Sequence, residues 1–241
     1  MNHHDRNSKI YLTRVHRLVT IGVVALPFFF LLMFSRVFGI PQGILLNDLG
    51  VSAFRIGVAY VIAAVLAWVC AVLFYRGKAS TIGLPVFDVL QSFPTFALLP
   101  LSTYVWGVSH RTIIFFLVLT IIWPIFFSII SSLKLVKHEW HEAASVFGLS
   151  GNNYFVKFLL PVSLPGLITG SIIGLGEGWE ALIATEIVVG SPSGLGSFFQ
   201  TYSHNLTVTM FGILGFLLLV FSINKVIWLA LLDWSHRTME E

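Results

Sequence analysis

Long apolar stretches separated by short polar segments make up most of this chain. Six stretches have about the 20 residues that a helix needs to cross a hydrocarbon core of about 30 Å. They cover residues 18–38, 54–75, 84–106, 112–133, 162–189 and 209–233. The pattern predicts an all-α integral membrane protein in which residues 18–233 form one domain of six transmembrane helices. Residues 1–17 and 234–241 are its polar ends.

The polar interruption before the fifth stretch, residues 134–161, has a helical pattern of its own. Trp140, Ala143, Ala144 and Phe147 recur at i, i+3, i+4 and i+7, as on one face of an amphipathic helix. Gly148 suits a left-handed stop to this helix. Ser150 can cap a second short helix whose apolar positions are Tyr154, Phe155, Phe158 and Leu159. We therefore expect a helix-turn-helix loop.

Composition supports the membrane assignment, because 56% of the residues are hydrophobic and 10% are charged, against about 25% charged in soluble domains. Lys and Arg mark the cytoplasmic side of a membrane protein. Ten of them fall on the side of the two termini: Arg6, Lys9, Arg14, Arg17, Arg76, Lys78, Lys134, Lys137, Lys157 and Arg237. Both termini and the 134–161 loop are thus predicted to be cytoplasmic. Topology accounts for the net charge of +3, so no nucleic-acid partner is expected.

The spacing within the loop resembles a family signature. Glu142-Ala143-Ala144, Gly148 and Leu160-Pro161 match the pattern E-A-A-x3-G-x9-I-x-L-P, with Phe158 in place of the isoleucine. This is the signature of permease subunits in bacterial binding-protein-dependent ABC importers. In that family the loop is a coupling element: Glu142 would make charged contacts with an ATPase, the alanines would allow close approach, and Gly148 would set the turn.

The resemblance also implies partners. They are two ABC ATPase subunits that bind ATP and Mg, a second permease subunit, and an extracytoplasmic substrate-binding protein, all at the bacterial plasma membrane. A homodimer is expected, with a heterodimer as the alternative. Gly77-Lys78-Ala79 lacks the upstream glycine and the hydroxyl residue of a phosphate-binding loop. We therefore expect no ATPase site, no cofactor and no enzyme activity in this chain.

Further segments narrow the resemblance to the nitrate, sulfonate and taurine permeases, a group that includes importers of bicarbonate and vitamin precursors. These segments are Gln91-Ser92-Phe93-Pro94, Leu99-Pro100-Leu101, Trp106-Gly107, Trp179, Glu186 and Gly194-Leu195-Gly196. The substrate implied is a small organic or inorganic anion such as sulfonate, nitrate or taurine, or a vitamin precursor. Glu177 and Glu180 depart from the commoner members and weigh against a small oxyanion.

Three carboxylates in the fifth stretch are costly in a membrane, at about 2.5–3.5 kcal/mol for each charge near the bilayer centre. At 100° per residue, Glu177 and Glu180 lie about 60° apart, whereas Glu186 lies about 180° from Glu177. At least two environments are therefore expected. Candidates for the translocation path are Gln91, Pro94, Tyr104, Glu177, Trp179, Glu180 and Glu186. The structural alternatives are an external helix end for Glu186, packing pairs for the other acids, and an interfacial position for Tyr104.

Two further patterns bear on packing and chemistry. A glycine occurs at every fourth position of the fifth stretch, Gly166, Gly170, Gly174 and Gly178, which permits close helix approach. His138 and His141 have helical spacing but no third ligand, so no metal site is predicted. An ATP-independent secondary transporter or channel, in which the intramembrane acids carry ions, is the alternative function; a membrane enzyme is a weaker third class.

Overall fold

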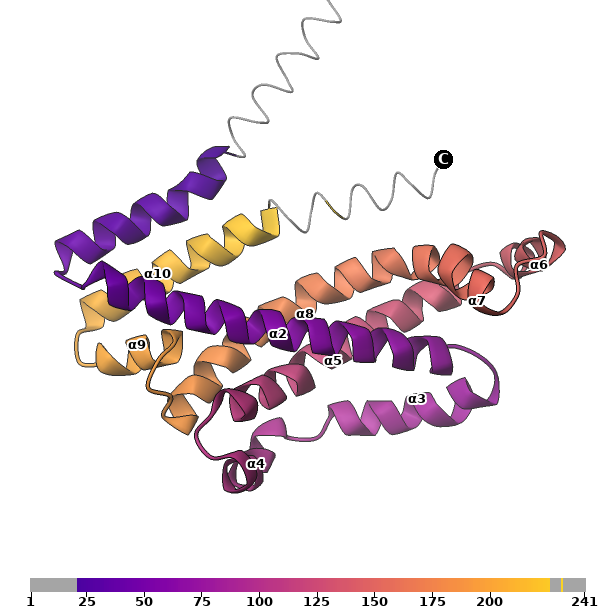
Figure 1. Ribbon diagram of the computed structural model, residues 1–241, viewed down its shortest axis with the longest axis horizontal. Helices are drawn as coiled ribbons and strands as arrows, with labels where there is room; N and C mark the ends of the chain where they lie inside the picture. The colour runs from indigo at the N-terminus through magenta and orange to yellow at the C-terminus, as the bar shows by residue number, and fades with distance from the viewer. Residues whose placement is uncertain (1–20, 226–230, 232–241) are drawn as a thin grey trace, which may run out of the picture. The chain divides into compact units, whose positions relative to one another are not determined.

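The computed structural model describes residues 21–225 and residue 231, and the regular structure in this part of the chain is helical (Figure 1). Its helices are Ile21–Val37, α2 (Gln42–Phe74), α3 (Gly77–Gln91), η1 (Thr95–Leu98), α4 (Leu99–Trp106), α5 (His110–Leu135), α6 (His138–Val146), α7 (Gly151–Tyr154), η2 (Phe155–Leu159), α8 (Leu160–Val189), α9 (Leu195–Thr201) and α10 (Leu206–Ile223). They belong to two compact units, one with residues 21–46 and 201–225, the other with residues 47–200.

Several helices are long and apolar enough to cross a membrane. In the described residues these are α2, α5, the continuous segment Gly151–Val189, and α10; the bent pair Gly77–Gln91 and Thr95–Trp106 makes a fifth if it is one span. Ile21–Val37 is apolar but shorter. The predicted first and last spans extend into residues outside the described part. The all-helical membrane class is confirmed, and the number six stays a prediction.

The larger unit is built on the pairing of α5 with α8, which lie side by side (Figure 1). The predicted glycine ridge of α8 forms this contact. A Cβ on Gly166 would lie 2.5 Å from the Ser128 carbonyl oxygen, and a Cβ on Gly170 would lie 2.6 Å from Ile125 Cα. Close backbone approach of this kind is the main source of helix association in lipid, where apolar side chains gain little by leaving the lipid.

The predicted third span is broken near Pro94, where the proline lacks the backbone N–H that a continuous helix uses. Helix α3 ends at Gln91, and the chain turns through Pro94 into the 3-10 helix η1 and then α4, with a bend of 75°. Pro100 lies in the first turn of α4, where the missing N–H costs no helical hydrogen bond. A broken span is tolerated in a membrane where it is covered by protein or lines a cavity.

The predicted second span, 54–75, lies almost entirely within a longer helix. Helix α2 starts at Gln42 and therefore contains Asp48, Ser52 and Arg55. Asp48 and Ser52 precede the predicted span and Arg55 is its second residue, and in the fold all three side chains are buried. Their partners lie far away in the chain, so hydropathy alone could not extend the helix.

In the smaller unit the helix Ile21–Val37 packs against α10. The rings of Phe30 and Phe211 stack with centroids 6.4 Å apart, and Gly215 leaves room for the Phe30 ring. Ser222 donates a hydrogen bond of 2.9 Å to the Val23 carbonyl oxygen. The two helices of this unit therefore pack through their phenylalanine rings, and Gly215 lets the Phe30 ring approach the α10 backbone.

Candidate functional site

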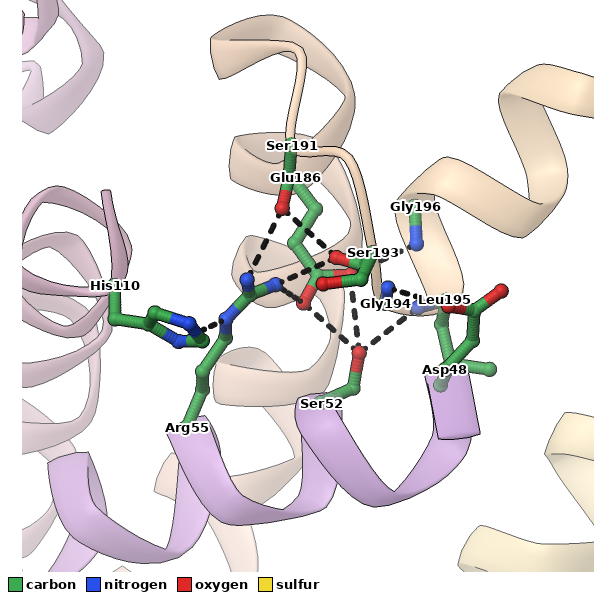
Figure 2. A network of polar contacts seen from close by, with 10 residues as sticks. All are labelled: Asp48, Ser52, Arg55, His110, Glu186, Ser191, Ser193, Gly194, Leu195 and Gly196. Carbon is green, nitrogen blue, oxygen red and sulfur yellow. Dashed lines mark hydrogen bonds and ion pairs between the residues drawn. The ribbon is translucent and has the colours of Figure 1, made fainter. Parts of the chain in front are cut away.

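One end of the larger unit holds a buried polar network around Glu186 (Figure 2). The Glu186 side chain lies near the end of α8 and is fully buried. Its carboxylate accepts hydrogen bonds from Arg55 Nη1 at 2.6 Å, from Ser52 Oγ at 2.8 and 3.0 Å, and from the Gly196 N–H at 2.8 Å. The guanidinium, one hydroxyl whose proton is shared between the two carboxylate oxygens, and one backbone N–H together offset the cost of burying this carboxylate.

Arg55 is 2% exposed and joins three parts of the unit. Besides Glu186, it donates to the Ser193 carbonyl oxygen at 2.9 Å, to Ser191 Oγ at 3.1 Å, and through Nε to His110 Nδ1 at 3.1 Å. His110 is the first residue of α5. The planar guanidinium therefore ties α2 to α8, to the loop after α8, and to the start of α5.

The loop between α8 and α9 is fixed by the same network. Gly194 N–H donates to Asp48 Oδ1 at 2.9 Å, and Leu195 N–H donates to Ser52 Oγ at 2.8 Å. Gly194 has φ +117, and a Cβ there would lie 2.5 Å from the Glu186 carboxylate. Glycine is thus required at this position both by conformation and by space. Glu186 thus holds α8, α2 and the following loop together. This structural role agrees with the alternative given above, in which Glu186 lies at a helix end and not on the translocation path.

Sequence reasoning missed Asp48, Ser52 and Arg55 as members of this cluster. One signal was available. Arg55 and Glu186 carry opposite charge and lie in apolar surroundings, and the predicted topology places the start of the second stretch and the end of the fifth on the same side of the membrane. Opposite charges at the same membrane depth are expected to pair.

A second feature is a pair of adjoining cavities along α5 and α8. The cavity that includes Glu177 has a volume of about 450 Å³ and is called the inner cavity below. The cavity that includes Trp140 has a volume of about 660 Å³ and is called the outer cavity; the two names do not refer to sides of the membrane. Both are lined by Phe127 and Ser128 of α5. The inner one is also lined by Gln91, Thr95, Leu119, Thr120, Trp123, Pro124, Ile173 and Glu177. The outer one continues along Ser131, Ser132, Leu135, Val136, Lys137, Trp140, Val162, Pro165, Gly166 and Thr169. We call the two together the α5–α8 groove.

Two of the seven path candidates, Gln91 and Glu177, line this groove. Glu177 and Glu180 are exposed on α8, whereas Glu186 is buried, so the predicted division of the acids into two environments is confirmed. Trp179 is buried, with 8% of its surface exposed. Pro94, Tyr104 and Glu180 are exposed and are not among the residues that line the two cavities.

A third feature is the pair of short helices after α5. Helix α6 ends in a turn at Gly148, whose φ of +71° favours glycine. The chain continues through α7 and η2 into α8, and Leu160 and Pro161 form the first turn of α8. Of the four residues in the predicted apolar stripe, only Ala144 is buried; Phe147 is more than four-fifths exposed, as is its neighbour Val146, which was not part of the stripe. Glu142 is also exposed and lies 3.3 Å from His138, a contact worth little at the surface.

Hydrogen bonds attach the short helices to the end of α2. Tyr154 Oη accepts from Arg76 Nη2 at 3.2 Å and lies 2.7 Å from His141 Nδ1. The His141 ring also packs edge-on against Phe158, at 5.2 Å between centroids. Burial, followed by the positive charges of Arg76 and His138, lowers the pKa of His141 below its usual value of 6.5. The neutral ring can then accept a hydrogen bond from the Tyr154 hydroxyl, while the Tyr154 oxygen accepts a hydrogen bond from Arg76.

Comparisons with known proteins bear on all three features. The chain is 31% identical to the nitrate import permease protein NrtB of Leptolyngbya laminosa over 193 residues, which are 77% of this chain and 68% of the relative. It is 28% identical to the bicarbonate transport system permease protein CmpB of Synechococcus elongatus, over 83% of this chain and 73% of the relative. It is 32% identical to the taurine transport system permease protein TauC of Escherichia coli K12, over 48% of this chain and 42% of the relative.

The family model described as "Binding-protein-dependent transport system inner membrane component" matches residues 63–237. This match covers α3 to α10, both cavities and the short helices, together with the last 12 of the 33 residues of α2. The chain therefore belongs to the family of inner membrane components of binding-protein-dependent transport systems, and it is a permease subunit of an ABC importer.

Proposed function

We propose that two copies of this chain form the translocation pathway of an ATP-driven importer in a bacterial plasma membrane. Each copy crosses the membrane six times with both termini in the cytoplasm. Two separate ATPase subunits bind ATP and Mg, and an extracytoplasmic binding protein delivers a small organic or inorganic anion such as sulfonate, nitrate or taurine, or a vitamin precursor. The family membership supports the importer and does not favour the ATP-independent carrier.

The observation that carries the ATPase coupling is the exposed surface of α6. Val146 and Phe147 are apolar and almost fully exposed, and Glu142 beside them is also exposed. Apolar side chains that project into water at a helix end suit the groove of another protein. With Ala143 next to them, these residues can enter such a groove closely, and Gly148 holds them at the turn.

Continuity of the helix explains how ATPase movement reaches the substrate path. Residues Gly151–Val189 form one segment that contains α7, η2 and α8. It carries Tyr154 at the docking end, Thr169 and Glu177 in the α5–α8 groove, and Glu186 at the far end. Closure of two ATPase subunits would draw the docking ends of two copies together and tilt α8. The groove would then open alternately to the two sides of the membrane.

The path itself is assigned to the α5–α8 groove. Its walls are lined with hydroxyl and amide groups, among them Gln91, Thr120, Ser128 and Thr169. These groups both donate and accept hydrogen bonds and so replace water around a polar solute. A homodimer would place two such grooves opposite each other and enclose the exposed Glu177 side chains between the copies.

Affinity purification of the tagged chain in mild detergent tests this proposal. The native chain should retain an ABC ATPase, and Phe147→Asp should lose it, because a charge replaces an exposed apolar contact without touching the core. Phe147→Leu is the matched control and should retain the ATPase. A native chain that purifies alone and transports solute into liposomes without ATP would overturn the proposal.

A further inference from the structure

The inner cavity of the α5–α8 groove contains a carboxylate, although several relatives of this chain are named as permeases for anions. Glu177 is the only ionisable side chain among its ten lining residues. The other polar groups around it are the Gln91 amide and the hydroxyls of Thr95, Thr120 and Ser128. An anion in this cavity would lie near a carboxylate with no cation to balance it.

Three basic side chains outside this cavity have contacts or positions of their own. Arg55 is buried against Glu186, and Arg76 donates to Tyr154 at the docking end. Lys137 lines the outer cavity, beyond Ser131 and Ser132. Among the residues that the structure describes, the inner cavity thus lacks the Lys or Arg that sites for nitrate or bicarbonate need to offset the negative charge.

Two further groups favour a positive charge in the same place. Helix α3 ends at Gln91, which lines the cavity, and the carboxyl end of a helix carries a partial negative charge. Trp123 lines the wall as well, and an indole ring attracts cations over its face. A carboxylate, a helix carboxyl end and an indole ring therefore meet at one cavity beside the break between α3 and η1.

We propose that the solute carried through this groove has a protonated nitrogen, which binds between Glu177 and Trp123. This inference rests on the proposed function and narrows its substrate class. An aminosulfonate zwitterion or a cationic vitamin precursor fits, because the hydroxyls and the Gln91 amide that line the cavity can donate hydrogen bonds to the rest of a polar solute. Nitrate and bicarbonate, which lack a positive group, do not fit.

Saturation-transfer NMR on the detergent-purified complex tests the inference with probes that differ only in charge. Taurine is compared with isethionate, which has a hydroxyl in place of the ammonium, and benzylamine is compared with benzyl alcohol. In the native protein the amine should bind more tightly than its alcohol in at least one pair. Glu177→Gln should reduce that preference by roughly tenfold or more, the value expected for a lost charge-assisted hydrogen bond.

Glu180→Gln is the matched control, since it makes the same change three residues away, outside the cavity lining, and should keep the amine preference. Equal binding of both members of both pairs, failure of every probe to bind, or an amine preference that survives in Glu177→Gln would each overturn the inference. Retention of the ATPase on the same purified sample is scored separately. A complex that keeps its ATPase but prefers the alcohols would refute the substrate class and leave the importer intact.

Discussion

Neutralising Glu186 should destabilise the permease strongly, although the residue lies outside the α5–α8 groove. In Glu186→Gln the side chain keeps its size but loses its charge, and the Arg55 guanidinium stays buried at 2% exposure without a counterion. The new amide also has one acceptor oxygen in place of two, so it cannot serve Arg55, Ser52 and the Gly196 N–H together.

The size of the effect follows from burial. Removing one partner of a fully buried ion pair costs about 3–5 kcal/mol. In a domain of this length a loss of that size lowers the midpoint of thermal unfolding by about 10 °C. Intrinsic tryptophan fluorescence of the purified protein, followed during heating, measures the shift. Glu180→Gln, the same change at an exposed site on the same helix, should shift the midpoint far less.

A double-mutant cycle separates the ion pair from general packing. Arg55→Met and Glu186→Met should each destabilise the protein, and the double variant should lose less than the sum of the two, because no unpaired charge then remains. If Glu186→Gln unfolds within about 2 °C of the native protein, or if the two methionine variants are additive, the network does not hold this end of the fold.

Three further outcomes are expected. Gly170→Ala should lower the unfolding midpoint, because its Cβ would lie 2.6 Å from Ile125 Cα, whereas Gly176→Ala, with nothing within 4 Å, should leave the midpoint equal or higher. Acidification below pH 6.5 should loosen the short helices, since the lowered pKa of His141 makes its protonation cost more in the folded state; hydrogen exchange of α6 at about pH 5.5 measures this, and Tyr154→Phe should show faster exchange already at neutral pH. Gly194→Ala should expose the loop after α8 to protease.

Hydropathy and spacing predicted the elements that depend on local sequence. The bounds of α5 and α8 agree with their predicted spans to within a few residues, and the close helix contact at Gly170 was expected from the glycine spacing. These features follow from apolar length and a missing side chain, which are properties of one segment.

The missed features depend on residues that are distant in the sequence. Arg55 and Glu186 are separated by 131 positions, and only the folded chain shows that the charge in α2 is paired. Likewise, Trp123 and Gln91 come together with Glu177 because α3, α5 and α8 meet around one cavity. A single sequence gives no signal for such a meeting.

The placement of these contacts along Gly151–Val189 explains why one chain can be rigid at one end and responsive at the other. At Glu186 the segment is held by a buried ion pair and by backbone N–H groups of the following loop. At Tyr154 it is held by partly exposed hydrogen bonds to Arg76 and His141, each of which is weaker because water competes for it. Under the proposed ATPase coupling, a force applied at α6 and α7 would therefore move the Tyr154 end more than the Glu186 end. Glu177 lies between the two ends and would shift within the groove as the segment tilts, and this shift would couple the state of the ATPase to the binding of solute.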